Sequence, residues 1–258
     1  MPKLDTYGGY VEIDGKARPI LWAMGERESI GTTTQGEDIW RGNELSNTPI
    51  APSSTTTIPT PPTAGEQMTF ISENDADNGA TATGVLTLRM EYLNANGDEM
   101  YEDITMNGTT PVNTSATDIR FINDIYSLTV GSNGVAEGNI RVMSQANNAL
   151  VYNMIHQGGN KSLVPHRMVP NGKKLILKGW HASEGNNKRC AFRIRSTDMY
   201  GELIPGVFCF KDTAYLNQNS SGELILNRQI PPLSIIKISG WATAINAEAG
   251  VGWWGYLI

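Results

Sequence analysis

The chain has 258 residues, a formal net charge of −6 and a hydrophobic fraction of 40%, which leaves room for two modest domains with real cores. Charged residues make up only 18%, below the about 25% of average soluble domains, and this is typical of proteins whose surface meets other protein. The acidic balance argues against nucleic acid or an anionic membrane as the main partner, because both require clustered lysine and arginine.

The cellular compartment can be inferred from two further features. No apolar run in the sequence reaches the roughly 18–20 residues of a membrane-spanning helix, and no hydrophobic signal core follows Met1. We therefore expect a protein that is made in a cytoplasm and has no membrane partner. Cys190 and Cys209 form no disulfide framework, so we expect both thiols to be reduced and buried.

Residues 1–65 are rich in glycine and proline and end in a Pro/Thr-rich linker, so they have little means of burying a core of their own. We interpret this segment as an extended N-terminal arm that becomes ordered on a partner surface. Its large apolar side chains form two short clusters. Because buried tryptophans dominate many interfaces, these clusters are the predicted assembly interface: Leu21, Trp22, Met24, Ile39 and Trp40.

Residues 66–148 are predicted to form a small antiparallel β domain. Alternating apolar residues predict a strand over 85–93, and the Asn96-Gly97 turn returns the chain into a second strand over 99–106. Residues 119–130 are rich in β-branched and aromatic residues, but their apolar parity changes partway. This change predicts a β-bulge near Asn123, and a fourth strand follows at 139–143.

Residues 149–258 are predicted to form a C-terminal β-sandwich of jelly-roll type, because short strand-like runs recur between Gly, Asn and Pro clusters. Residues 150–155 could be a linking strand or one helical turn. The predicted strands are 174–180, 190–195, 207–211, 223–226, 235–242 and 253–258. Trp180, Trp241, Trp253 and Trp254 lie in or beside these runs, where core packing and stacking on a sugar ring are both open.

The sequence predicts no catalytic, cofactor-binding or metal-binding residue, and hence no enzyme. His156, His166 and His181 lack metal-ligand spacing. Gly250–Gly255 matches a dinucleotide-binding string, but no helix can follow it, so we expect a closely packed strand instead. Asp75 and Asp77 lie in a polar stretch that is interpreted as turn chemistry, with a weak cation site as the alternative.

One stretch resembles structural proteins of tailed bacteriophages. The run 71–84, the strand that ends in Asn94-Ala95-Asn96-Gly97, and the turn Met106-Asn107-Gly108-Thr109 are similar to a serine- and aspartate-containing segment, a "Leu-Asp-Ala-Asn-Gly" strand end and a "Leu-Asn-Gly-Thr" turn in that group. Residues 39–42, 140–142 and 169–173 extend the resemblance over most of 39–175. The departures are small, such as Met106 in place of leucine.

The resemblance implies a non-enzymatic virion component that is made in the host cytoplasm and resides in the virion. We expect it to dock through its N-terminal arm on capsid, portal or tail subunits, to form a homo-oligomer, and to stabilise or decorate the particle. The alternative is a receptor- or glycan-binding module of a tail fibre or tip. In both cases the expected fold is all-β.

Overall fold

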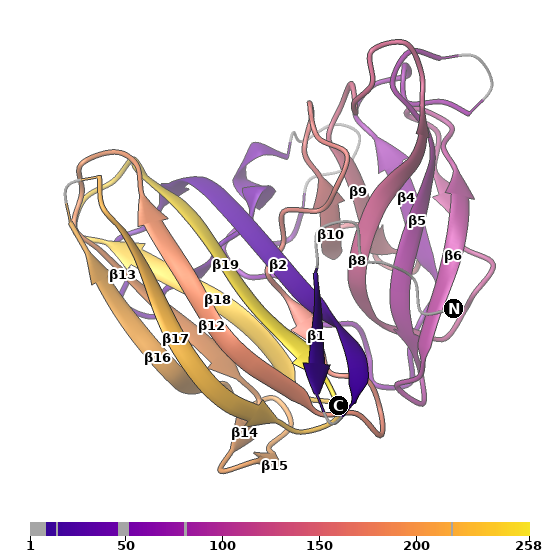
Figure 1. Ribbon diagram of the computed structural model, residues 1–258. Coiled ribbons are helices and arrows are strands. Elements are labelled where there is room, and N and C mark those ends of the chain that lie inside the picture. The colour runs from indigo at the N-terminus through magenta and orange to yellow at the C-terminus, as the bar shows by residue number, and fades with distance from the viewer. Residues whose placement is uncertain (1–8, 14, 46–51, 80–81, 218) are drawn as a thin grey trace. The chain divides into compact units, whose positions relative to one another are not determined.

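The computed structural model describes residues 9–13, 15–45, 52–79, 82–217 and 219–258. Within these ranges the chain forms antiparallel β-strands and one short 3₁₀ helix, η1 (Arg41–Glu44), which confirms the all-β prediction (Figure 1). Two compact units are present. Unit 1 comprises residues 1–40 and 165–258, and unit 2 comprises residues 41–164.

This division corrects the predicted boundaries of 1–65, 66–148 and 149–258. Unit 2 is an insertion in the sequence of unit 1, and the first 40 residues belong to the same unit as the C-terminal strands. Each unit has its own hydrophobic core. The predicted domain at 66–148 is therefore too short at both ends.

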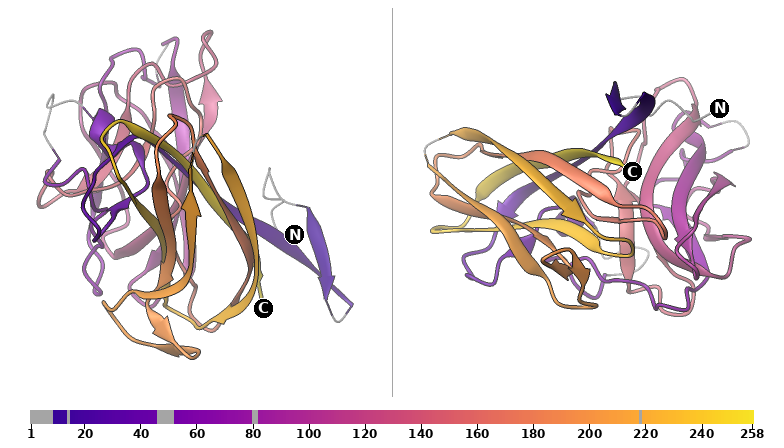
Figure 2. Two further views of the ribbon diagram at one scale, coloured as in Figure 1. Left: turned by 90° about the vertical axis from the view of Figure 1, so that its left-hand side faces the viewer. Right: turned by 60° about the horizontal axis from the view of Figure 1, so that its bottom comes forward.

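Unit 1 contains two large antiparallel sheets (Figures 1 and 2). Sheet 1 has the strand order β1 (Tyr10–Ile13), β2 (Lys16–Ile30), β19 (Ala247–Leu257), β12 (Leu175–Glu184) and β17 (Ser221–Ile230). Sheet 2 has the order β11 (Arg167–Met168), β18 (Ile235–Ala242), β13 (Cys190–Ser196) and β16 (Cys209–Leu216), and β3 (Glu37–Asp38) also pairs with β18. A small hairpin of β14 (Asp198–Met199) and β15 (Glu202–Leu203) completes the unit.

Both sheets contribute side chains to one core. Trp180 and Trp253 are fully buried there beside Phe192 of sheet 2. Each indole N–H has an acceptor: Trp180 Nε1 donates to Asp212 Oδ2 at 3.1 Å, and Trp253 Nε1 donates to the Pro165 carbonyl at 3.1 Å. Because an unpaired buried N–H is costly, these bonds make the two tryptophans compatible with an apolar interior.

The predicted N-terminal arm is wrong for the described residues of that segment. β2 pairs with β19 along the register from Ile20 opposite Tyr256 to Ile30 opposite Ala247. Residues 52–65 belong to unit 2, where Ile58 is buried. Residues 46–51 of the predicted linker lie outside the described residues. The surface on which β2 is ordered is therefore β19, the last strand of its own chain.

Unit 2 contains two smaller sheets. One has the order β10 (Val151–Ile155), β9 (Ile140–Ser144), β4 (Met68–Ser72) and β7 (Val112–Asn113), and the other has the order β6 (Glu99–Thr105), β5 (Val85–Asn94) and β8 (Ile119–Val130). The predicted hairpin is confirmed, the strand predicted at 139–143 is present as β9 one residue further along the chain, and β10 shows that residues 151–155 form a strand. The predicted bulge is also confirmed, because Glu91 pairs with Asp124 and Tyr92 with Ile122, which leaves Asn123 as the extra residue.

Asp77 joins the separate strands of unit 2. Its buried carboxylate accepts hydrogen bonds from the Ser72 hydroxyl at 2.6 Å and from the backbone N–H groups of Val85 at 2.8 Å and of Glu137 and Gly138 at 3.0 Å. Four donors occupy both oxygens, so this carboxylate has the surroundings of a structural anion and not of a cation ligand. This favours turn chemistry for the loop.

Candidate functional site

The five predicted interface residues do not form one surface. Leu21, Ile39 and Trp40 are buried, with Ile39 and Trp40 at 0% exposure, so their assignment to an assembly interface is corrected. Leu21 and Ile39 belong to the core of unit 1. Trp22 and Met24 instead lie on the outer face of sheet 1, because alternate residues of β2 point to opposite faces. Met24 is 46% exposed.

Trp22 is joined on this outer face by Trp254, which the sequence did not assign to the site. The two residues are opposite each other in the β2–β19 register, and their rings stack with centroids 5.5 Å apart and an interplanar angle of 24°. Gly179 on β12 makes room for the pair, since a Cβ at Gly179 would overlap the six-membered ring of Trp254. The indole of Trp254 therefore extends across the neighbouring strand.

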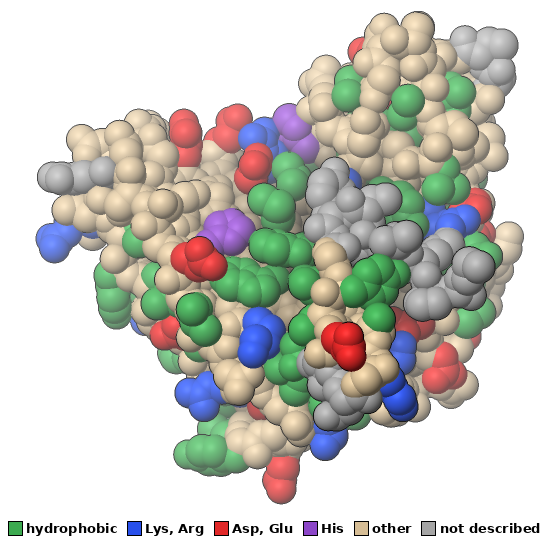
Figure 3. Space-filling view, viewed as in Figure 1, with side chains coloured by type: hydrophobic (Ala, Val, Ile, Leu, Met, Phe, Trp, Pro, Cys, Tyr) green, Lys and Arg blue, Asp and Glu red, His purple; other side chains and the backbone are tan. Residues whose placement is uncertain are grey.

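The next strand continues the apolar row. Ile225 on β17 lies opposite Gly179 and is 85% exposed, which is unusual for an isoleucine in a strand. Ile20, Tyr256 and Ile176 form a parallel, partly exposed row one step along the sheet. We call these outer-face residues the apolar band: Ile20, Trp22, Met24, Ile176, Ile225, Trp254 and Tyr256. Figure 3 shows hydrophobic side chains gathered over sheet 1.

His181 borders the apolar band. Its ring lies against Gly252, where a Cβ would overlap Cε1 of the imidazole. Burial lowers the pKa of His181, although the nearby carboxylate of Glu223 acts in the opposite direction. The imidazole is therefore neutral at pH 7 and adds a polar but uncharged margin to the band.

Charged residues lie at both ends of the outer face. Glu26, Glu223 and Glu248 lie toward the end of sheet 1 where β12 ends and β17 begins. Arg18 and Lys174 lie toward the other end of the sheet, and Lys178 lies within the band, at the register shift between Leu177 and Gly179. The face is thus graded from acidic to apolar to basic along the strand direction.

A second cluster lies on sheet 2 and is buried. Asp38 accepts from Lys237 Nζ at 2.8 Å and from Arg195 Nη2 at 3.3 Å. Burial lowers the pKa of Lys237, against the stabilising charge of Asp38. Burial and the positive charges of Lys237 and Arg195 hold the pKa of His166 well below its ordinary value. These contacts attach β3 to sheet 2, so we interpret them as structural.

Among the residues with described positions, no three His, Cys, Asp or Glu side chains come together in a group that could hold a metal ion. Over the same ranges, none of the helical segments has the length and apolar character needed to cross a membrane.

The chain shows little similarity to the known proteins with which it was compared. No protein-family model matches the chain, and no curated protein sequence matches it. One solved structure, titled "Structure of infectious bursal disease virus Gx strain", aligns with 98% of this chain and 74% of its own chain at 8% sequence identity and a TM-score of 0.26.

Proposed function

We propose that this chain is a non-enzymatic structural protein of a bacteriophage virion, and that copies of it associate through the apolar band. The observation that carries the proposal is the exposure of the band, in which a stacked tryptophan pair adjoins an isoleucine that is 85% exposed. A contiguous apolar surface of this kind marks an interaction site in soluble proteins. The resemblance of residues 39–175 to phage structural proteins supports the virion setting.

The strand order of unit 1 supports a jelly-roll fold. If β2, β3, β12, β13, β16, β17, β18 and β19 are lettered B to I in chain order, sheet 1 contains the order B-I-D-G and sheet 2 the order C-H-E-F. This is the arrangement of an eight-stranded jelly roll, which recurs in viral capsid and lectin domains. Fold analogy alone does not assign a function, so it only adds to the argument from the band.

The charge gradient of the outer face favours a second copy as its partner. Under a two-fold axis through the band, the acidic end of one copy lies over the basic end of the other, and the apolar rows cover each other. A face that is complementary to itself in this way produces a closed dimer. In the virion we propose that this dimer contacts capsid, portal or tail subunits.

The dimer can be tested with a matched pair of substitutions. Ile225→Glu places a charge in the band, whereas Ile245→Glu makes the same change at an isoleucine that is 69% exposed in the loop between β18 and β19. Sedimentation at increasing concentration should show a dimer for the parent chain and for Ile245→Glu, and a monomer for Ile225→Glu. A parent chain that stays monomeric over a 100-fold range of concentration would contradict the proposed dimer.

The virion assignment needs a separate measurement. Electron cryomicroscopy of intact particles of the phage that encodes the chain should reveal density for units 1 and 2 at defined symmetry positions. Mass spectrometry of the same purified particles should detect the chain at a stoichiometry of many copies. Particles that lack the chain would exclude a structural role in the virion even if the isolated protein dimerises.

A further inference from the structure

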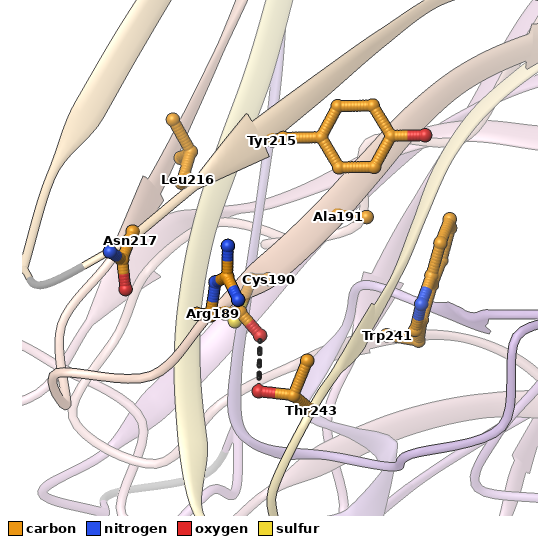
Figure 4. A pocket seen from close by; sticks show the side chains of 8 residues that line it. All are labelled: Arg189, Cys190, Ala191, Tyr215, Leu216, Asn217, Trp241 and Thr243. Atoms are coloured by element: carbon orange, nitrogen blue, oxygen red, sulfur yellow. Dashed lines mark hydrogen bonds between the residues drawn. The ribbon is translucent and has the colours of Figure 1, made fainter.

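A cleft on the outer face of sheet 2 has the features of a ligand site. Tyr215 and Trp241 are the two cross-strand neighbours of Ala191, so a pair of aromatic side chains flanks a small floor (Figure 4). The cleft has a volume of about 300 Å³, at the lower end of the ~300–1,000 Å³ found for small-molecule sites. Tyr215 is 75% exposed, so its ring is available to a ligand.

Trp241 is held in place from outside the cleft. The guanidinium of Arg193 lies 4.1 Å from the Trp241 ring centroid and 4.5 Å from that of Phe210. Arg193 follows Ala191 on β13, whereas the cleft extends toward Arg189, in the opposite direction along the strand. Arg193 therefore orients the indole without occupying the cleft. Preorganised aromatic faces reduce the entropy cost of stacking on a ligand.

The far end of the cleft has polar groups on fixed backbone. Asn217 and Thr243 line it together with Arg189, whose carbonyl accepts a hydrogen bond from Thr243 N–H at 2.9 Å. Glu184 holds the two loops beneath this end, because its carboxylate accepts from the backbone N–H groups of Lys188 at 2.8 Å and Asn219 at 3.0 Å. Three separate segments of the chain, which contain Arg189, Asn217 and Thr243, therefore form the rim.

We propose that this cleft binds a pyranose ring that carries a carboxylate, as in a glycan that contains uronic acid. Flat aromatic faces pack against the apolar C–H face of a pyranose, and the amide and hydroxyl at the rim suit its hydroxyl groups. Arg189 is the charged residue among those that line the cleft, and a guanidinium binds a carboxylate through paired hydrogen bonds.

Cys190 does not give the cleft a covalent role. Cys190 lies in the lining but is buried, and burial, with a smaller effect of Glu184, raises the pKa of its thiol to about 11. The thiol is therefore protonated at neutral pH and is a poor nucleophile. The inference is reversible recognition of a saccharide, and it does not depend on the proposed virion assembly.

The test compares two probes that differ only at C6: β-1,4-linked tetraglucuronic acid and cellotetraose. Saturation-transfer NMR and calorimetry with the full chain should show binding of tetraglucuronic acid and about twofold to fivefold weaker binding of cellotetraose, as expected for one exposed ion pair. Arg189→Gln should remove this preference. Ile225→Glu should bind the probe like the parent chain, which separates this inference from the proposed dimer.

Aromatic variants test the location. Tyr215→Ala should weaken binding about tenfold or more, as expected for a central aromatic contact, and Trp241→Ala should do the same. Tyr200→Ala is the matched control, since Tyr200 is 98% exposed on the β14–β15 hairpin. If Trp241→Ala lowers the melting temperature, Tyr215→Ala alone decides the location. No saturation transfer to either probe, or equal binding by Tyr215→Ala and the parent, overturns the site, and equal binding of the two probes overturns the acidic specificity.

Discussion

Trp22 on β2 and Trp254 on β19 stack with ring centroids 5.5 Å apart, so the first and last long strands of the chain are joined by side chains as well as by backbone hydrogen bonds. The two tryptophans of the N-terminal segment, Trp22 and Trp40, thus lie in different environments. Trp22 lies on an outer face, and Trp40 lies in the interior with 0% exposure. The two tryptophans should therefore respond differently to substitution.

Trp40→Ala should destabilise the folded chain by about 3–5 kcal/mol, because it removes a fully buried indole and leaves a cavity. Trp22→Ala should cost less in the monomer, where it removes a partly exposed ring and a stacking contact of about 0.5–1.5 kcal/mol. Urea unfolding followed by fluorescence measures both. Equal losses of stability for the two variants would contradict the difference in burial.

Gly179→Ala should displace the Trp254 ring, because the new Cβ would occupy the space of the indole. The stacked pair should couple electronically in the parent chain, so far-ultraviolet circular dichroism should lose an exciton signal in the variant. Gly172→Ala serves as a contrast, since a Cβ there meets no atom within 4 Å, although its positive φ of 70° adds backbone strain. An unchanged spectrum in Gly179→Ala would exclude the coupling.

Fragments should fold according to the two units and not according to the boundaries suggested by the sequence. Residues 41–164 should fold alone, because this unit has its own core. A fragment of residues 66–258 should fail to form unit 1, since it lacks β2 and leaves the edge of β19 that pairs with β2 without a partner strand. Amide exchange and limited proteolysis of both fragments provide the measurement. A protected β19 in the shorter chain would restore the arm interpretation.

Asp77→Asn should destabilise unit 2 by roughly 2 kcal/mol or more, because hydrogen bonds to a buried charge are worth about 1.5–3 kcal/mol each. The asparagine amide NH₂ would also face N–H and O–H groups that are themselves donors, so it could not replace the carboxylate oxygen as an acceptor. Asp75→Asn is the control. Asp75 is exposed and accepts bonds from the Thr109 N–H and hydroxyl, which lower its pKa. Thermal unfolding of the fragment 41–164 should show a larger fall in melting temperature for Asp77→Asn than for Asp75→Asn.

Glu184 should make unit 1 sensitive to acid. Burial alone would raise its pKa, but the backbone N–H donors of Lys188, Asn219 and Asn186 outweigh burial, so the pKa lies below its ordinary value of 4.5. For a carboxylate with a depressed folded-state pKa, the stabilisation is complete above the unfolded pKa and is lost as the pH falls through the folded value. The melting temperatures of the parent and Glu184→Gln should therefore differ at pH 7 and converge below pH 4.5. A difference that persists at the lowest pH would assign the effect to packing.

Local features of this fold follow directly from short stretches of sequence. The turn at Asn94–Gly97 has Gly97 at a positive φ of 84°, and the parity change in 119–130 appears as the bulge at Asn123. Both depend on a few neighbouring residues. The glycines of 250–255 likewise signal a closely packed strand, and Gly252 and Gly255 lie against His181 and the Ile176 carbonyl.

The candidate site was only partly visible in the sequence. The sequence identifies Trp22 and Met24 as apolar residues in need of a partner, but nothing in it connects Trp254 and Ile225 with them. Adjacent apolar residues in 20–24 and 253–257 supply both faces of a strand, so their pattern does not say which face is the core. The location of sheet 2 decides that Trp253 is buried and Trp254 is on the outer face.

By itself the sequence determined the all-β class, most strand positions and the turns, because alternation and glycine conformations are properties of neighbouring residues. The tertiary structure alone decided that residues 1–40 complete unit 1 and that unit 2 is inserted between β3 and β11. The physical reason is that a strand satisfies its backbone hydrogen bonds on another strand. For β2 that partner is β19 at the far end of the chain, and no local pattern encodes the pairing.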